Sequence, residues 1–175
     1  MLGYGRYEEL DDYKPGGRHP LHIGDYLNNG RYWIMNRLGS GTFSTVWLAF
    51  DGNSTEHRFV AVKVLTAEAS ERASVASLLH MGEKKSGRSF VVEVLDSFET
   101  TGPNGVHQCV VTELLGPTLE AVVEAIARQG LTPKLGAQSR KRLILECLTG
   151  VAELHSRGVV HGGAYCSSSP DRRLS

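Results

Sequence analysis

The sequence lacks long apolar runs, has no excess of charge of either sign and contains few cysteines. Its 175 residues include 19 Lys and Arg against 19 Asp and Glu, so the formal net charge is zero. This balance argues against a protein that holds nucleic acid through a basic surface. No stretch approaches the roughly 18 uncharged apolar residues of a membrane-spanning helix. We therefore expect neither a nucleic-acid partner nor a membrane partner.

The three cysteines, Cys109, Cys147 and Cys166, are odd in number and show no metal-ligand spacing. They predict free thiols in a reducing compartment. The N-terminal residues carry no basic segment followed by an apolar core, so no secretory signal is expected. Together these absences predict an intracellular protein, cytoplasmic or nuclear. A hydrophobic content of 41% excludes disorder throughout and suffices for one domain, or for a small domain with part of another.

Hydrophobic patterning divides the chain into a strand-rich part and a later helical part. Residues 1–31 are polar and rich in turn formers, without a helical or strand period. The expected strands are Tyr32–Leu38, Ser44–Phe50, Phe59–Leu65, Phe90–Phe98 and Val106–Leu115. The expected helices are Ala67–His80, Thr118–Gln129 and Ser139–Ser156. Antiparallel strands followed by helices predict an α+β fold.

The most informative segment chemically is a glycine-containing loop between two expected strands. It reads Leu38-Gly39-Ser40-Gly41-Thr42-Phe43-Ser44-Thr45-Val46. Alone, such a pattern is weak, because a plain hairpin whose glycines take positive φ would look the same. A strand follows the loop where a Rossmann fold needs a helix, and the Gly-Lys-Ser/Thr of a Walker loop is absent. A glycine loop between strands can instead lie over a triphosphate, with its amides toward phosphate oxygens.

Lys63 interrupts an otherwise apolar strand, one strand after the glycine loop. A lysine on an edge strand commonly points to solvent. Its position after the loop instead favours a cation that lies beneath the loop and pairs with phosphates. Ala61, two residues earlier on the same face, is small enough to admit a purine ring. Loop and lysine together predict ATP binding.

These features, together with the segment before them, resemble a known family. Residues 13–20 read Tyr-Lys-Pro-Gly-Gly-Arg-His-Pro, and Ile23-Gly24-Asp25 and Gly30-Arg31-Tyr32 follow. With a glycine loop that carries Ser44 in place of a third glycine, they resemble the SR-protein kinase family of eukaryotic protein kinases. The resemblance covers about residues 8–163. It implies an N-terminal lobe of a five-stranded antiparallel sheet and one helix, followed by the first helices of an incomplete helical C-terminal lobe.

The resemblance also implies a division of the chain and a function. Residues 1–31 would be a family leader, 32–115 an ATP-binding N-terminal lobe, and 116–163 the hinge with partial C-terminal-lobe helices. Residues 164–175 would be a loose tail without a counterpart in the family. The implied function is a serine/threonine protein kinase that uses ATP and magnesium on Ser/Arg-rich protein substrates.

Individual roles follow from the same resemblance. Thr112 would be the gatekeeper behind the adenine pocket, and the Glu113 carbonyl and Leu115 amide would bond the purine edge. The strand lysine pairs with a helix glutamate in kinases. Here Glu71 is favoured over Glu68, unless the pair is missing and Glu71 belongs to a solvated helix face. The implied ATP-binding set is Leu38, Gly39, Ser40, Gly41, Thr42, Phe43, Ser44, Thr45, Val46, Ala61, Lys63, Thr112, Glu113 and Leu115.

The resemblance fails where a catalytic loop is expected. Gly163 stands at the position of the catalytic aspartate and Ser168 at that of the magnesium-binding asparagine. No Asp-Phe-Gly motif follows. The abrupt loss after Gly162 suggests a frame change, an unspliced intron or an early stop. We therefore expect ATP binding without phosphotransfer, with no intact catalytic residue and no protein ligand for magnesium.

Two further expectations concern interactions other than catalysis. The alternative function is a non-catalytic nucleotide-binding or scaffold module of kinase descent. In the last expected helix, an apolar stripe through Ile144, Leu148 and Val151 would lack the helices that cover it in a complete lobe. An exposed apolar stripe predicts a partner-binding face.

Overall fold

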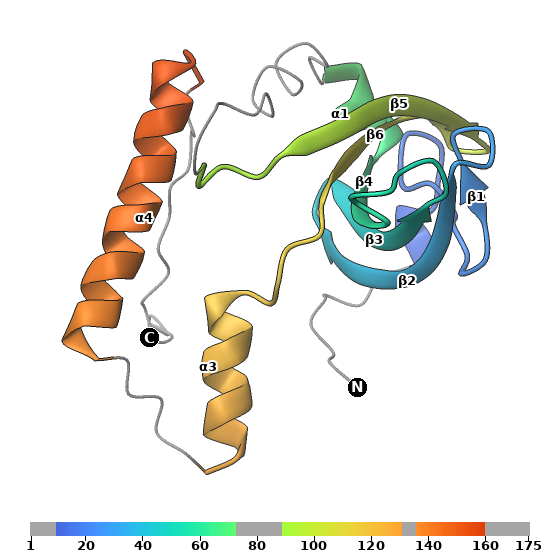
Figure 1. The fold of residues 1–175 in the computed structure, drawn as a ribbon. Helices are drawn as coiled ribbons and strands as arrows, with labels where there is room; N and C mark the ends of the chain where they lie inside the picture. The colour runs from blue at the N-terminus through green and yellow to red at the C-terminus, as the bar shows by residue number, and fades with distance from the viewer. Residues whose placement is uncertain (1–9, 73–88, 131–135, 160–175) are drawn as a thin grey trace, which may run out of the picture.

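A curled antiparallel sheet dominates the computed structural model, which describes residues 10–72, 89–130 and 136–159 (Figure 1). The sheet has six strands in the order β1-β2-β3-β4-β6-β5, and every neighbouring pair is antiparallel. The strands are β1 Tyr26–Leu27, β2 Tyr32–Gly41, β3 Ser44–Asp51, β4 Phe59–Leu65, β5 Val94–Gly102 and β6 Gly105–Glu113.

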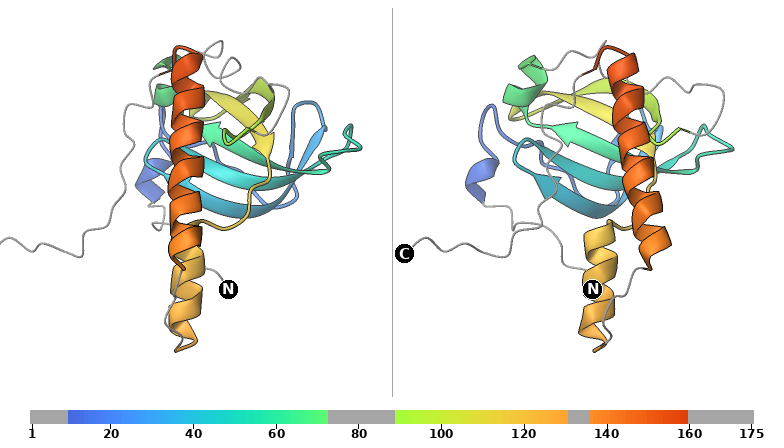
Figure 2. Two further views of the ribbon diagram at one scale, coloured as in Figure 1. Left: turned by 60° about the vertical axis from the view of Figure 1, so that its left-hand side comes forward. Right: turned by 90° about the vertical axis from the view of Figure 1, so that its left-hand side faces the viewer.

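The helices lie around this sheet rather than within it. They are the short 3-10 helix η1 Leu10–Asp12, α1 Ala67–Arg72, α3 Leu119–Arg128 and α4 Ala137–Ser156. In Figures 1 and 2, α3 and α4 form the helical part that follows the sheet along the chain. Helix α4 meets the approach to β5 at Glu153, whose carboxylate accepts hydrogen bonds from the Ser89 hydroxyl at 3.0 Å and the Phe90 amide at 3.4 Å.

The expected α+β order of antiparallel strands followed by helices is confirmed, with corrections to individual strands. Strand β5 is Val94–Gly102 instead of the expected Phe90–Phe98. The sheet has a sixth strand, because the leader contributes β1 along the edge of β2. Two residues are too few to show the alternation by which a strand is found in a sequence. Strand β2 also continues through Gly41, so only Thr42 and Phe43 remain as the turn before β3. The expected helix beyond Arg72 and the expected tail at 164–175 lie outside the described residues.

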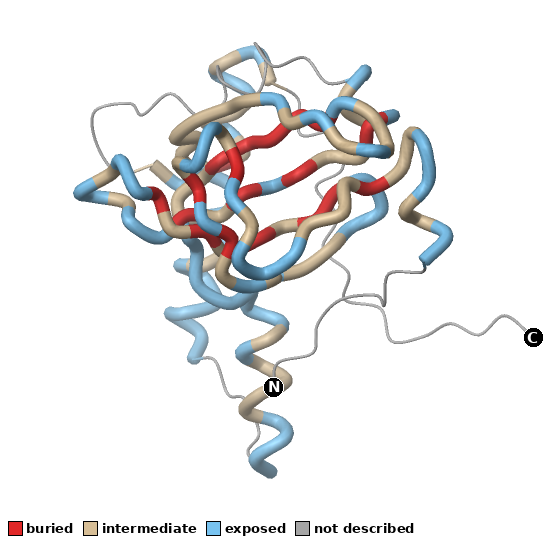
Figure 3. Tube along the Cα trace, turned by 90° about the vertical axis from the view of Figure 1, so that its right-hand side faces the viewer, coloured by how far each residue is buried: buried red, intermediate tan, exposed pale blue. Residues whose placement is uncertain are grey.

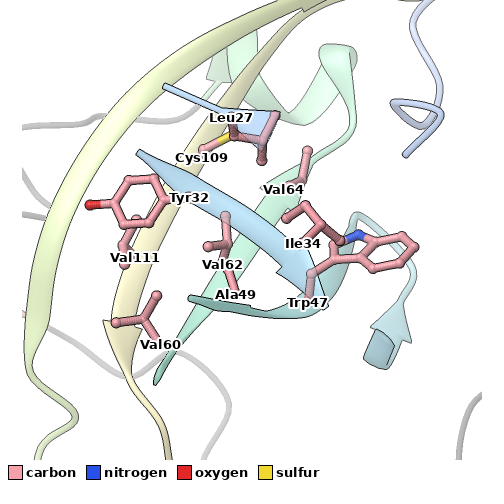
Figure 4. Packing of buried hydrophobic residues seen from close by; sticks show 10 residues of the cluster. All are labelled: Leu27, Tyr32, Ile34, Trp47, Ala49, Val60, Val62, Val64, Cys109 and Val111. Carbon is pink, nitrogen blue, oxygen red and sulfur yellow. The ribbon is translucent and has the colours of Figure 1, made fainter. Parts of the chain in front are cut away.

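The core occupies one face of the sheet. Successive side chains of a strand point to opposite faces, and alternate residues of the central strands are buried (Figure 3). Valine is well suited to this position because its branched side chain packs on a pleated surface. The ten residues of the buried cluster, shown in Figure 4, are Leu27, Tyr32, Ile34, Trp47, Ala49, Val60, Val62, Val64, Cys109 and Val111.

The sheet curls until β5 meets β2 from the opposite side. The rings of Tyr32 and Phe98 stack with centroids 5.5 Å apart. The Tyr32 hydroxyl donates to Asp96 Oδ2 at 2.6 Å, and Arg31 Nη1 donates to the same oxygen at 2.9 Å. Arg31 also holds the buried Asp51 with two hydrogen bonds, at 3.0 and 2.9 Å. Burial raises the pKa of Asp51, but the hydrogen bonds and charge of Arg31, together with backbone amides at Asn53 and Ser54, lower the pKa overall.

Replacing Tyr32 with Phe tests this closure. The change keeps the stacked ring but removes the hydroxyl from Asp96. Since a hydrogen bond to a charged group is worth about 1.5–3 kcal/mol, we expect urea denaturation to show a loss of that size. The control is Tyr26→Phe at an exposed position, where we expect a change within about 0.5 kcal/mol. Equal effects of the two substitutions would contradict the role given to Asp96.

Candidate functional site

The pairing of β3, β4 and β6 places four of the predicted site residues on one face of the sheet. Val46 lies opposite Lys63, and Ala61 lies opposite Thr112. Directly paired residues of antiparallel strands point to the same side, and Ala61 and Lys63 are two residues apart on one strand. We call these four residues the site face. The core cluster occupies the other side of the same strands.

The site face is more open than the core behind it. Val46, Ala61 and Thr112 are half-buried and Lys63 is exposed, whereas Val62 between Ala61 and Lys63 is fully buried. Within the described parts of the chain, the Lys63 ammonium forms no ion pair. The site face therefore presents a small residue beside a cation that no described residue pairs with.

The expected pair between Lys63 and Glu71 is not formed. Glu71 is exposed on α1, and neither residue has an ion-pair partner among the described residues. The other candidate, Glu68, accepts a hydrogen bond from Arg72 at 2.6 Å, one turn along the helix. Ser70 attaches α1 to β6, because its hydroxyl oxygen accepts the Gln108 amide hydrogen at 2.8 Å. The helix is thus fixed beside β6 without a carboxylate bonded to Lys63.

The glycine hairpin, which we define as residues 39–46, leads directly from the site face. Gly39 pairs with Val46 and Gly41 pairs with Ser44 across the two-residue turn. Neither Gly39 nor Gly41 has a positive φ, so the alternative that the turn needs glycine for its backbone conformation is wrong. A Cβ atom added to Gly41 would meet nothing within 4 Å. The space beside this backbone is therefore open to a ligand.

Not every predicted hairpin residue contributes a side chain to the site face. Thr45 is buried on the core side, where its Oγ1 accepts the Trp47 Nε1 hydrogen at 3.1 Å. Ser44 is also buried. Leu38 falls at a register shift in β2 and is exposed, as is Phe43 in the turn. Of Thr45, therefore, only the backbone and not the side chain could contact a ligand beside the hairpin.

The end of β6 carries the predicted purine-edge residues. The Glu113 amide donates to the Glu93 carbonyl at 3.2 Å, and Glu113 Oε1 accepts the Glu93 amide at 2.9 Å. Both the backbone and the side chain of Glu113 are thus bonded to Glu93. The Thr112 hydroxyl donates to the Glu113 carbonyl at 3.2 Å. A carbonyl oxygen has two lone pairs and accepts a second bond. Leu115 is 63% exposed, and its amide has no hydrogen-bond partner in the described chain.

Sequence reasoning missed the importance of Arg18 in the leader. Its side chain is only 8% exposed and reaches the base of the glycine hairpin. The only sequence signal is its place in a turn-forming run, which does not identify a partner.

The neighbouring His19 packs against His107, with ring centroids 4.8 Å apart. Burial, and then the nearby His107, lower the pKa of His19.

Several expectations fall on residues that the structure does not describe or on features away from the sheet. Gly163 and Ser168 lie outside the described residues. Among the described residues, no group of three or more His, Cys, Asp and Glu side chains is placed to hold a metal ion. In that part of the chain, no helix is both long and apolar enough to cross a membrane. On α4, Ile144 and Leu148 are 61% and 60% exposed, while Val151 is half-buried.

Comparison with known proteins finds similarity to protein kinases. The chain is 35% identical over 166 residues to human SRSF protein kinase 3 and 34% identical over 163 residues to the serine/threonine-protein kinase SKY1 of Saccharomyces cerevisiae. These curated matches are to kinases of the SR-protein kinase type. The matches cover 90% and 88% of this chain, but only 28% and 21% of the two kinases. It is also 33% identical over 162 residues to the protein kinase dsk1 of Schizosaccharomyces pombe, covering 29% of that protein.

A solved structure supports the fold assignment of this chain. The crystal structure of the PF14_0431 kinase domain superposes with a TM-score of 0.62 over 78% of this chain and 38% of that one. The sequence identity is 20%, so this likeness concerns the fold alone. No family model matches the chain. The sheet and its helices therefore correspond to a kinase N-terminal lobe with early helices of the C-terminal lobe.

Replacing Gly41 with Ala tests whether the hairpin needs this glycine in order to fold. We expect the free energy of unfolding to stay within about 0.5 kcal/mol, because the added methyl group meets open space. The matched control is Gly17→Ala in the leader, where the added Cβ would clash with the Asp12 carbonyl oxygen. There we expect a loss of about 1–3 kcal/mol in urea denaturation. A large loss at Gly41 would show that the fold itself selects this glycine.

Proposed function

We propose that the chain binds ATP on the site face, as the nucleotide-binding lobe of a serine/threonine protein kinase of the SR type. The observation that carries this proposal is the strand register, which joins Val46, Ala61, Lys63 and Thr112 on one side of the sheet. Lys63 is exposed and has no ion-pair partner among the described residues, so its charge is available to phosphate.

The described residues have the chemical groups that a nucleotide needs from its binding site. Lys63 would pair with phosphate oxygens, and the open backbone at Gly41 would let hairpin amides approach them. Ala61 leaves room for a flat ring beside Val46, with Thr112 behind it. The Glu113 carbonyl would accept from the purine edge and the Leu115 amide would donate to it. When bound, ATP supplies the phosphoryl group for transfer.

We propose that this sequence does not carry out that transfer. Gly163 has no side chain that could accept a proton or orient a substrate hydroxyl, and Ser168 is a poor magnesium ligand. General-base assistance alone is worth about 10²–10⁴ in rate, and electrostatic stabilisation of the transferring group is usually a larger contribution. In the family, magnesium would be held at the position that Ser168 occupies, whereas Gly163 stands at the position of the catalytic base, so no step is assigned to magnesium here.

The proposal extends to protein partners of this lobe. Ser/Arg-rich proteins would be the substrates of a complete kinase of this type. The exposed Ile144 and Leu148 on α4 would bind another protein surface, because a pair of large aliphatic side chains on one helical face favours burial.

Replacing Lys63 with Ala tests nucleotide binding. We expect the dissociation constant for ATP to rise about tenfold or more, because a charge-assisted hydrogen bond worth about 1.5–3 kcal/mol is removed. Isothermal titration measures the affinity directly. Thermal unfolding provides a second readout, since ligand at a hundred times its dissociation constant stabilises by about 2.7 kcal/mol.

The control is Lys141→Ala, which removes the same charge from an exposed position on α4. We expect this variant to bind ATP as the unmodified chain does. Equal affinities of the Lys63 and Lys141 variants would refute the proposed site, as would an unmodified chain that does not bind millimolar ATP.

A kinase assay tests the proposed lack of phosphotransfer. The purified chain is incubated with radiolabelled ATP, magnesium and a peptide of repeated Ser-Arg dipeptides. We expect no more labelled peptide than with the Lys63→Ala variant, since no general base is present at Gly163. Phosphorylation clearly above that of the variant would show that another residue replaces the missing aspartate.

A further inference from the structure

The leader fastens the glycine hairpin to the start of helix α1. We propose that residues 10–18 act as a brace that holds the hairpin in its ligand-binding position, with Arg18 as the positioning residue. This inference rests on the proposed function, in which the hairpin lies over the phosphates of ATP. It assigns to the leader a role in nucleotide affinity, although no leader residue belongs to the site face.

Arg18 hydrogen-bonds to both strands of the hairpin, at the two residues that flank its turn. Its Nη1 donates to the Ser44 carbonyl at 3.1 Å, and its Nη2 donates to the Gly41 carbonyl at 2.9 Å. Gly41 and Ser44 are the pair that closes the turn. The planar guanidinium can span two carbonyls in this way, whereas a lysine ammonium is a single point of attachment. The two contacts therefore fix the separation and orientation of the strands where the turn begins.

The charge of Arg18 is already balanced within the leader. Its Nε donates to Asp12 Oδ2 at 3.0 Å, and the side chain is 8% exposed. A buried guanidinium paired in this way offers little attraction to a ligand at a distance. Arg18 accordingly acts through the hairpin backbone rather than by contact with phosphate.

The same leader segment bonds the first turn of α1. The Gly17 carbonyl accepts the Ala67 amide at 3.0 Å, and the Gly16 carbonyl accepts the Glu68 amide at 2.9 Å. These amides belong to the group at a helix N-terminus that has no partner within the helix. The leader thus supplies partners that the helix itself lacks, and it ties the helix start to the segment that carries Arg18.

A direct bond between the hairpin and the helix start completes this connection. The Thr66 amide, just before α1, donates to the Phe43 carbonyl in the turn at 2.9 Å. On its outer side the leader is held by the β5–β6 turn, where Asn104 Nδ2 donates to the Arg18 carbonyl at 2.6 Å and the Asn104 carbonyl accepts the Gly16 amide at 2.8 Å. Hairpin, leader and helix start form one hydrogen-bonded unit.

Such bracing favours binding because it reduces the cost of ordering. The turn residues Thr42 and Phe43 are exposed and pack little, and a two-stranded hairpin alone is only marginally stable. A free hairpin would lose conformational entropy when its amides engage a ligand. A hairpin already held in place loses less, so it binds more tightly.

Substitution of Arg18 tests the brace. Arg18→Met keeps much of the side-chain length without the guanidinium, and Arg18→Lys restores the charge without the two-carbonyl contact. For both variants we expect the dissociation constant for ATP to rise about tenfold and the hairpin amides at 41–46 to exchange hydrogen faster. Since Lys cannot span both carbonyls, restored charge alone is not expected to rescue affinity.

The matched control is Arg31→Met, which removes another arginine that pairs with a carboxylate and bridges strands, far from the hairpin turn. We expect it to lower the free energy of unfolding while the ATP affinity and the exchange of the hairpin amides stay unchanged. If Arg18→Met does not fold, Asp12→Asn takes its place, because it loosens the guanidinium while keeping its buried position filled.

The outcomes separate the brace from the proposed function. Unchanged affinity and unchanged hairpin exchange in the Arg18 variants would overturn the brace. So would an equal loss of affinity in the Arg31 variant, because the effect would then be general destabilisation. If the unmodified chain does not bind ATP, the proposed function fails. In that case hairpin exchange alone decides whether Arg18 holds the hairpin.

Discussion

The alternation of side chains along β4 governs both the stability of this lobe and the chemistry of its site. Val60, Val62 and Val64 point into the core, so Ala61 and Lys63 must point to the other face. Burying each valine is worth about 1.5–3 kcal/mol, whereas burying an unpaired ammonium costs more than that. If the strand slipped by one residue, the three valines would turn to the site face, and Ala61 and Lys63 would turn into the core. The core therefore fixes the orientation of the candidate site.

The curvature of the sheet is maintained at a distance from that site. Arg31 and Tyr32 on one side meet Asp96 on β5, so the core is enclosed between strands that are far apart in sheet order. At the other end of the strands, Arg18 attaches the leader to the glycine hairpin. The two arginines act on opposite ends of β2 and β3. Arg31 closes the sheet around its core, and Arg18 bonds to the glycine hairpin beside the site face.

The alternation of apolar residues along the sequence predicted the features that depend on neighbouring residues. The β-branched and alternating segments of β2, β3, β4 and β6 gave the strands, and the place of Lys63 after the glycine loop indicated one shared face. Strand β1 was missed because two residues show no period. The contacts of Arg18 span 23 and 26 residues, and nothing in the adjoining sequence encodes them. The orientation of Thr45 toward Trp47 and the lack of a Lys63–Glu71 pair likewise depend on tertiary packing.

The central claim is that adenosine nucleotide lies on the face of the sheet that carries Ala61 and Lys63. Amide chemical shifts of the nitrogen-15-labelled chain, recorded while ADP is added, test this residue by residue. We expect shifts at residues 39–46, 61–63 and 112–115, and almost none at the exposed aromatic pair Tyr26 and Trp33, which lie on β1 and at the start of β2. Shifts centred on that pair, or none at saturating nucleotide, would contradict the claim.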